Sequence, residues 1–143
     1  MITFDKLLRI RQEKGAGYLV LIDPDKQSPK ETVARALASA ENGADAVLIG
    51  GSLLFSVEFD KLLANVNETV DCPIIIFPGS LAQISRFADA ILFLVLISGR
   101  NPQNLIGEQV IASPTIKALG IEAISTGYML IESGRTTAAQ YMS

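Results

Sequence analysis

The sequence predicts an α/β fold in which helices cover a parallel β-sheet. Short runs rich in Val, Leu and Ile are typical of strands buried on both faces, and they lie at 17–22, 45–49, 73–77, 90–97 and 120–126. Segments with helical periodicity separate most of these runs. Because parallel strands need long crossovers, which are usually helical, this alternation indicates neighbouring strands that run in the same direction.

The predicted helices are recognised from their apolar faces and from their ends. Residues 3–14 form an amphipathic pattern. Ser28 is a favourable N-cap and Glu31 completes a capping box, so a second helix is predicted to start there and to stop at Gly43. Further helices are predicted at 56–69, 80–87 and 102–117. Pro114 is expected to kink or break the last of these.

Composition excludes several classes of protein. The chain has 143 residues and a net charge of −3, without a basic patch, so nucleic-acid binding is not expected. Its longest apolar run, 90–97, is too short to cross a bilayer, and we expect a cytoplasmic protein without a membrane span. With no His and one Cys, Cys72, the chain lacks the residues for Ser-His-Asp catalysis, Cys-His catalysis or an internal disulfide. Carboxylates, hydroxyls, backbone amides, Lys, Arg and a hard cation remain for chemistry.

Polar or glycine-bearing loops follow four of the predicted strands. Parallel strands bring their carboxyl ends to one edge, where α/β proteins carry their active sites. An open doubly wound sheet and a TIM (β/α)8 barrel both fit this alternation. No G-x-G-x-x-G follows the first strand, and polar loops on successive strands favour the mouth of a barrel. These loops are Asp23–Lys26, Gly50–Ser52, Pro78–Ser80 and Ser98–Asn101.

A complete barrel takes about 250 residues, more than this chain has. Residues 1–143 are therefore predicted to form a single unit, the N-terminal portion of a barrel with about five parallel strands, in which strands six to eight are absent. A five-strand arc leaves two unpaired edges and an exposed apolar face. We expect the isolated chain to aggregate, to form a homo-oligomer, or to depend on a further segment.

Asp23 is the strongest candidate for a metal ligand, because it ends the first strand. Mg²⁺ is commonly held by one or two carboxylates together with substrate phosphates. Gly50 and Gly51 let a backbone approach phosphate oxygens, and Ser52 can donate to a phosphate or complete the shell of a cation. Each motif also has a purely structural interpretation, a β-turn at Asp23 and an ordinary strand-to-helix connection at the glycines.

Three further residues lie on the same predicted edge. Arg100 can clamp a diphosphate with its planar guanidinium, or it can be exposed in a loop where Asn101 caps the next helix, and both interpretations stay open. Tyr128 follows the fifth strand and either faces the site or is half-buried at the rim. Phe77 is expected to shape a channel, and Phe93 is expected to belong to the core.

Taken together, these motifs resemble those of the geranylgeranylglyceryl phosphate synthase family, which includes bacterial heptaprenylglyceryl phosphate synthases. The resemblance covers nearly the whole chain and depends on the order and spacing of the motifs. They are Leu21–Lys26, Gly50–Ser52, Phe77–Ser80, Ile97–Gln103 and Thr126–Ile131. The resemblance implies a TIM barrel that transfers a polyprenyl group from its diphosphate to sn-glycerol 1-phosphate, with Mg²⁺, in ether-lipid synthesis.

The resemblance also implies roles for individual residues. It places the Mg²⁺ ion at Asp23 and Ser52, and it places Tyr128 close to the reacting allylic carbon as a catalytic residue. We expect the cationic side chains of this edge to help neutralise the departing diphosphate. The predicted substrate-binding residues are Gly50, Gly51, Lys26 and Arg100.

The chain departs from the family pattern in two ways. The family's glycerol-phosphate contacts belong to strands six to eight, and Leu21 stands where the bacterial branch has Lys. The half that holds the polyprenyl diphosphate is thus predicted to be present without the acceptor half, and we expect little or no transferase activity from these residues alone. Two alternatives stay open: another phosphate-binding TIM-barrel enzyme, and a non-catalytic truncated fragment that oligomerises or makes peripheral contact with lipid.

Overall fold

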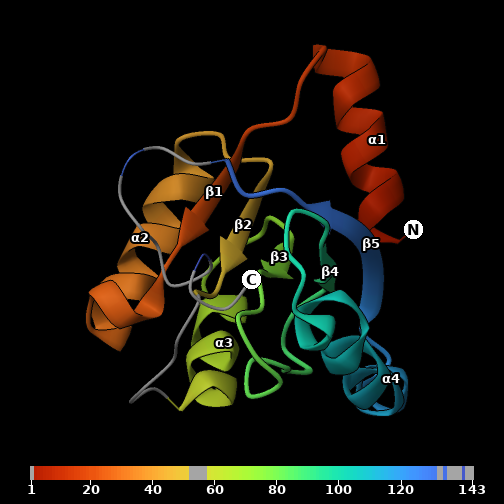
Figure 1. Ribbon diagram of the computed structural model, residues 1–143. Coiled ribbons are helices and arrows are strands. Elements are labelled where there is room, and N and C mark those ends of the chain that lie inside the picture. Colours follow the sequence, from red (N-terminus) through yellow and green to blue (C-terminus); the bar gives the residue numbers. More distant parts are fainter. Residues whose placement is uncertain (1, 52–57, 132–133, 135–139, 141–143) are drawn as a thin grey trace.

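The computed structural model describes residues 2–51, 58–131, 134 and 140, and these contain one sheet of five parallel strands (Figure 1). The strands are β1 (Leu19–Ile22), β2 (Ala46–Ile49), β3 (Ile74–Ile76), β4 (Ala90–Leu96) and β5 (Glu122–Tyr128). Their order in the sheet is their order in the chain. A barrel wall has this sequential order, whereas a doubly wound sheet reverses direction at a switch point. The predicted arc of about five parallel strands is therefore confirmed.

One helix precedes the sheet, and helices connect every pair of successive strands except β3 and β4. They are α1 (Thr3–Lys14), α2 (Pro29–Glu41), α3 (Phe59–Asn67) and α4 (Glu108–Leu119), with a 3₁₀ turn at Pro24–Lys26 and a π-helical turn at Gln103–Gly107. The predicted capping box is confirmed at α2, where the Glu31 N–H donates to Ser28 Oγ and the Ser28 N–H donates to Glu31 Oε2. Within the described ranges, no helix is long and apolar enough to span a membrane.

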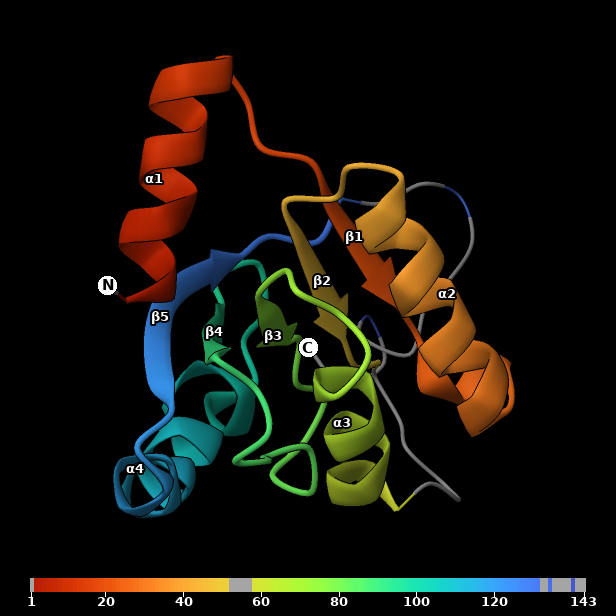
Figure 2. The same ribbon diagram turned by 180° about the vertical axis from the view of Figure 1, so that it is seen from behind.

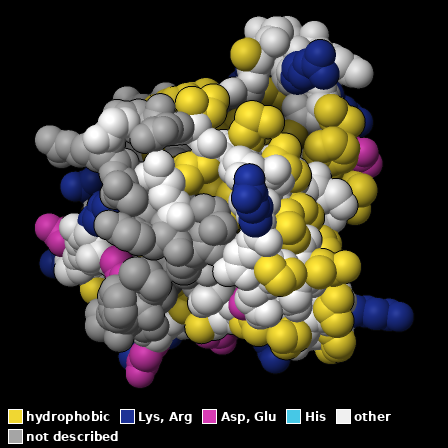
Figure 3. All heavy atoms as spheres, in the orientation of Figure 1, with side chains coloured by type: hydrophobic (Ala, Val, Ile, Leu, Met, Phe, Trp, Pro, Cys, Tyr) yellow, Lys and Arg dark blue, Asp and Glu magenta, His cyan; other side chains and the backbone are white. Residues whose placement is uncertain are grey.

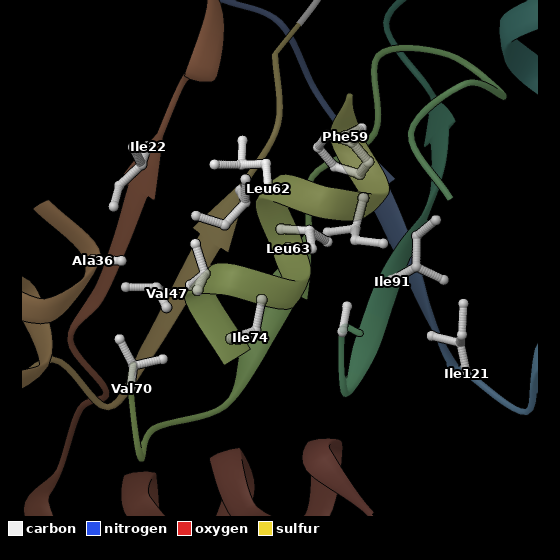
Figure 4. Packing of buried hydrophobic residues seen from close by; sticks show 14 of the residues in the cluster. Ile22, Ala36, Val47, Phe59, Leu62, Leu63, Val70, Ile74, Ile91 and Ile121 are labelled. Atoms are coloured by element: carbon white, nitrogen blue, oxygen red, sulfur yellow. The ribbon is translucent and has the colours of Figure 1, made fainter. Parts of the chain in front are cut away.

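The main hydrophobic core lies between the sheet and the helices α2, α3 and α4 (Figure 4). Leu62 and Leu63 of α3 are almost completely buried against Val47 of β2 and Ile74 of β3. Burying one such side chain contributes roughly 1.5–3 kcal/mol. Phe93 is half-buried and packs against the same cluster, as expected for a core residue, although it also lines a cavity beside β4. This packing fixes the strands so that their carboxyl ends share one edge.

The other face of the sheet is only partly covered. Leu7 of α1 and Phe77 pack against a second, smaller cluster on this face. Leu19 and Leu21 of β1 remain 38% and 52% exposed. In the described part of the chain, β1 and β5 each pair with a neighbour on one side only. An open edge and an uncovered apolar face are the features expected of an incomplete barrel.

Helix α1 stands apart from the other helices, beside β5 (Figures 1 and 2). The N–H groups of Thr3 and Phe4, in its first turn, both donate to the carboxylate of Glu122 in β5. At its other end, Lys14 Nζ lies 2.5 Å from Asp45 Oδ1. The exposed hydrophobic side chains of this face gather over α1, β5 and α4 (Figure 3). Helix α1 is therefore held by backbone hydrogen bonds to a carboxylate at its start, by an ion pair at its end and by apolar packing.

One predicted helix was wrong. The segment 80–87 forms turns and not a helix, because its polar side chains Gln83 and Ser85 are completely buried and bond to Gly51 at the exit of β2 and to Asp60 in α3. Helix α4 runs through Pro114 without a break, and the other predicted outcome, a kink at Pro114, stays a prediction. Pro114 leaves the carbonyl of Val110 without its intrahelical donor. Because both residues are exposed, water can hydrate that carbonyl.

Candidate active site

Asp23 lies at the exit of β1 with its carboxylate fixed at the rim of the sheet. It caps the 3₁₀ turn that follows, since its Oδ1 accepts from the Asp25 N–H at 3.1 Å. Its Oδ2 lies 3.1 Å from Lys26 Nζ, and the Asp23 side chain is 24% exposed. The carboxylate is therefore both held in place and open to a ligand. The turn and the candidate ligand are compatible interpretations of the same residue.

Gly50 and Gly51 bring the exit of β2 against Asp23. Gly50 has a φ of +149°, and a Cβ there would lie 2.0 Å from the carbonyl oxygen of Phe77. A Cβ on Gly51 would lie 2.6 Å from Asp23 Oδ1. The structure thus brings Asp23 and Gly51 together, as expected for neighbouring strand ends, and only glycine leaves room for the carboxylate.

The N–H groups of these two glycines already have partners within the protein. The Gly50 N–H donates to the Ile22 carbonyl at 3.2 Å, and the Gly51 N–H donates to Gln83 Oε1 at 3.3 Å. A cradle of free N–H groups is therefore not formed at Gly50 and Gly51. That Gly50 and Gly51 contact the substrate stays a prediction. Such a contact would come from the close approach of their backbone to the ligand and not from free N–H groups.

Asp23 and its surroundings fit Mg²⁺ if a phosphate ligand completes the coordination shell. Mg²⁺ takes one or two carboxylates and keeps several positions for water or phosphate oxygens. The described residues contain no group of three or more His, Cys, Asp or Glu side chains that could hold a metal by themselves. Ser52, the second predicted ligand, lies outside the described residues, so its role stays a prediction. The described part of this site supplies one carboxylate for such a shell, and the Mg²⁺ ion stays a prediction.

Tyr128 and Phe77 form an aromatic pair beside this rim. Their ring centroids are 5.7 Å apart and the rings are almost perpendicular, at 88°. Both rings line a mostly apolar cavity of about 140 Å³ between β4, β5 and α4, together with Leu94 and Leu96 of β4. Its polar lining residues are Ser80, Asn104, Glu108 and Gln109. Gly51 also lines this cavity. A single glycine therefore borders the Asp23 carboxylate on one side and an apolar cavity on the other.

Arg100 and Lys26 are exposed and do not line the cavity. Asn101 Oδ1 accepts from the Gln103 N–H at 3.0 Å, as expected for a residue that caps the next turn. Ser98 Oγ accepts from the Leu130 N–H at 2.9 Å and so ties the exits of β4 and β5 together. The contact of Arg100 and Lys26 with a diphosphate stays a prediction.

Gln83 is a site residue that sequence reasoning missed. Its side chain is completely buried, and its Nε2 donates to the Gly51 carbonyl at 2.8 Å. The pattern around it suggested a short helix, in which a Gln would face solvent. The only feature of the sequence that could have pointed to Gln83 is that this polar residue follows closely after the Phe77–Ser80 loop.

Residues 8–141 match the sequence model described as the PcrB family. The chain belongs to this family. It is 42% identical over 134 residues to the geranylgeranylglyceryl phosphate synthase of Chitinophaga pinensis, covering 93% of this chain and 53% of that protein. It is 43% identical over 119 residues to the enzyme of that name from Methanothermobacter thermautotrophicus, covering 83% of this chain and 49% of that protein. The resemblance inferred from the motifs is confirmed.

Solved structures agree with this assignment. The wild-type GGGPS from Thermoplasma volcanium superposes with a TM-score of 0.85 at 31% identity, over 95% of this chain and 55% of that one. The (S)-3-O-geranylgeranylglyceryl phosphate synthase from Thermoplasma acidophilum, in complex with its substrate sn-glycerol-1-phosphate, gives 0.84 at 33% identity, over 94% and 54%. The fold is that of the TIM-barrel synthases, and the PcrB-family chain spans about half the length of the relatives it matches.

Proposed function

We propose that this chain is the polyprenyl-diphosphate-binding part of a prenyltransferase. The enzyme would move a geranylgeranyl or similar polyprenyl group from its diphosphate to sn-glycerol 1-phosphate, in the cytoplasm, as a step of ether-lipid synthesis. The observation that carries the proposal is the position of Gly51, between the Asp23 carboxylate and the apolar cavity. A ligand with a charged head and an apolar tail matches this pair of surroundings. The names of the relatives support the same substrates.

The charged residues of the rim would act on the diphosphate. Asp23 and Ser52 would hold the Mg²⁺ ion, which supplies stabilisation of the negative charge that develops on the leaving group. Lys26 Nζ lies 3.1 Å from Asp23 Oδ2, so the Lys26 ammonium would lie close to a diphosphate bound at Asp23. Arg100, at the exit of β4, offers a guanidinium that can take two phosphate oxygens at once. Electrostatic stabilisation of this kind is usually the largest catalytic contribution.

The aromatic pair would act on the prenyl group. As the allylic carbon–oxygen bond breaks, its electron pair leaves with the diphosphate and the carbon becomes cationic. The faces of Tyr128 and Phe77 attract such a cation, by about 0.5–2 kcal/mol per ring. The glycerol hydroxyl oxygen then bonds to the carbon, and its proton passes to water or to the diphosphate. A cationic electrophile needs no strong base, which suits a chain without His.

The uncovered face of the sheet at β1 suggests where the remaining part of the active site would be added. Leu19 and Leu21 are exposed in β1, which pairs on one side only among the described residues, and they favour association with a further segment or with a second copy of the chain. Contacts for sn-glycerol 1-phosphate would come from beyond β5. For this reason we expect residues 1–143 alone to bind a polyprenyl diphosphate but to show little or no transfer.

The test is calorimetric titration of geranylgeranyl diphosphate into the chain, with and without Mg²⁺. Binding should tighten at least tenfold with Mg²⁺, and Asp23→Asn should remove this dependence because it removes the carboxylate. Asp71→Asn is the matched control, since it makes the same change at an exposed position before β3, at the amino end of the sheet. Unchanged Mg²⁺ dependence in Asp23→Asn would refute the metal role. Equal affinity for ribose 5-phosphate would favour a different phosphate-binding barrel.

A further inference from the structure

Gln83 is a polar side chain in a place where the core would otherwise be apolar. Its exposure is zero, and burying an amide without partners costs roughly 1–3 kcal/mol. Here both ends of the amide are satisfied by one residue. Nε2 donates to the Gly51 carbonyl at 2.8 Å, and Oε1 accepts from the Gly51 N–H at 3.3 Å.

These two hydrogen bonds between Gln83 and Gly51 continue the pairing of β2 with β3 beyond its last pair of strand residues, Ile49 and Ile76. The Phe77 N–H donates to the Ile49 carbonyl at 3.0 Å, and among the described residues this is the last backbone hydrogen bond between the two chain segments. The Gln83 side chain then offers Gly51 one donor and one acceptor, as a neighbouring strand would. Its own backbone is fixed by a bond from its N–H to the Ser80 carbonyl at 3.1 Å. The connection between β3 and β4 therefore holds the exit of β2.

The residue that Gln83 holds is the one that borders Asp23. Because a Cβ on Gly51 would come within 2.6 Å of Asp23 Oδ1, the backbone and the carboxylate are already in close contact. A shift of Gly51 by about one ångström would change the room beside the carboxylate, and misplacements of this size matter at active sites. Ser85, two residues further on, is equally buried but points elsewhere, since its hydroxyl donates to Asp60 Oδ1 at 2.6 Å.

We propose that Gln83 is a positioning residue, which fixes the backbone of Gly51 and thereby sets the space beside Asp23 for a Mg²⁺-bound diphosphate. The ligand in this statement rests on the proposed function. The hold on Gly51 does not, and it can be tested by itself. Gln83 touches neither the prenyl group nor the reacting carbon in this account.

The experiment compares the whole chain with Gln83→Met, which keeps the length of the side chain and removes both hydrogen bonds. Gln83→Asn serves as a second variant if the first fails to fold, since it keeps an amide but withdraws it from Gly51. Ser85→Ala is the control for loss of a buried polar contact in the same loop. The two measurements are amide hydrogen exchange at Gly51 by NMR, and calorimetric binding of inorganic pyrophosphate with and without Mg²⁺.

In Gln83→Met, exchange at Gly51 should rise at least tenfold, while exchange at Gly50, whose N–H donates to Ile22, should change less than twofold. The dissociation constant for pyrophosphate with Mg²⁺ should rise at least tenfold, and without Mg²⁺ it should stay within twofold. Ser85→Ala should lower thermal stability and leave both measurements unchanged. If Gln83 only stabilised the fold, Gln83→Met would behave like Ser85→Ala: it would lower thermal stability without changing exchange at Gly51 or the binding of pyrophosphate.

Two results overturn the inference: unchanged exchange at Gly51 in Gln83→Met, or an unchanged Mg²⁺-dependent dissociation constant in a folded Gln83 variant. If the unaltered chain binds pyrophosphate without any Mg²⁺ dependence, the proposed function and the ligand part of this inference both fail. The exchange measurement still decides in that case whether Gln83 holds Gly51.

Discussion

Replacing Gly50 with alanine tests how closely the exit of β2 is enclosed. At a φ of +149°, a residue with a side chain is strained by about 1–3 kcal/mol. The added Cβ would also lie 2.0 Å from the carbonyl oxygen of Phe77 and 2.8 Å from its carbon, so backbone must move. Overpacking of this kind costs about 1–3 kcal/mol. Taking the middle of both ranges, we expect Gly50→Ala to lower the free energy of unfolding by about 4 kcal/mol.

The matched control is Gly43→Ala. Gly43 also has a positive φ, +86°, but nothing lies within 4 Å of an added Cβ, so only strain of about 1–2 kcal/mol is expected. Urea denaturation at 25 °C measures both values, and the melting temperature of Gly50→Ala should fall by about 10 °C. A loss for Gly50→Ala within about 1 kcal/mol of that for Gly43→Ala would show that the enclosure by Phe77 is not real.

Three other predictions concern parts of the fold away from the rim. Glu122→Gln should speed amide exchange in the first turn of α1 and cost about 1 kcal/mol, as for loss of a helix cap; unchanged exchange would contradict the contact with Thr3 and Phe4. The bond from Lys14, with help from the Tyr18 N–H, lowers the pKa of Asp45, so this carboxylate stabilises the fold above its unfolded pKa of about 4 and ceases to as the pH falls. Asp45→Asn should therefore lower the urea midpoint at pH 7 and flatten its decline towards pH 3, and a parallel decline in both proteins would refute this. Leu62→Ala, at a site that is 2% exposed, should cost about 2–5 kcal/mol in the same assay, and a cost below about 1 kcal/mol would contradict its place in the core.

Much of the fold was predictable because local patterns and tertiary packing agree. The apolar runs became strands since helices α2, α3 and α4 bury one face of the sheet that they form, and the capping box at Ser28 and Glu31 depends on residues three apart. The segment 80–87 shows the limit of local patterns. Its backbone was free to form a helix, but the buried bonds of Gln83 and Ser85 to residues 25 or more positions away required another conformation.

The candidate site was predictable to a similar extent. Asp23 and Gly51 were expected to meet because neighbouring parallel strands end at one edge, and they do. The hydrogen bond made by the Gly51 N–H could not be foreseen, since its acceptor is the Gln83 side chain from a different loop. Likewise, no periodicity in the sequence could place the rings of Phe77 and Tyr128 against one another.

The contact between the start of α1 and Glu122 bears on how the polypeptide folds during synthesis. Thr3 and Glu122 are 119 positions apart in the chain. Such a separation is costly to close and slows folding. On the ribosome, α1 emerges first and must wait for β5 before it finds this partner. Until then its apolar side chains are available to chaperones, so newly made protein should be especially vulnerable to aggregation just before β5 is released.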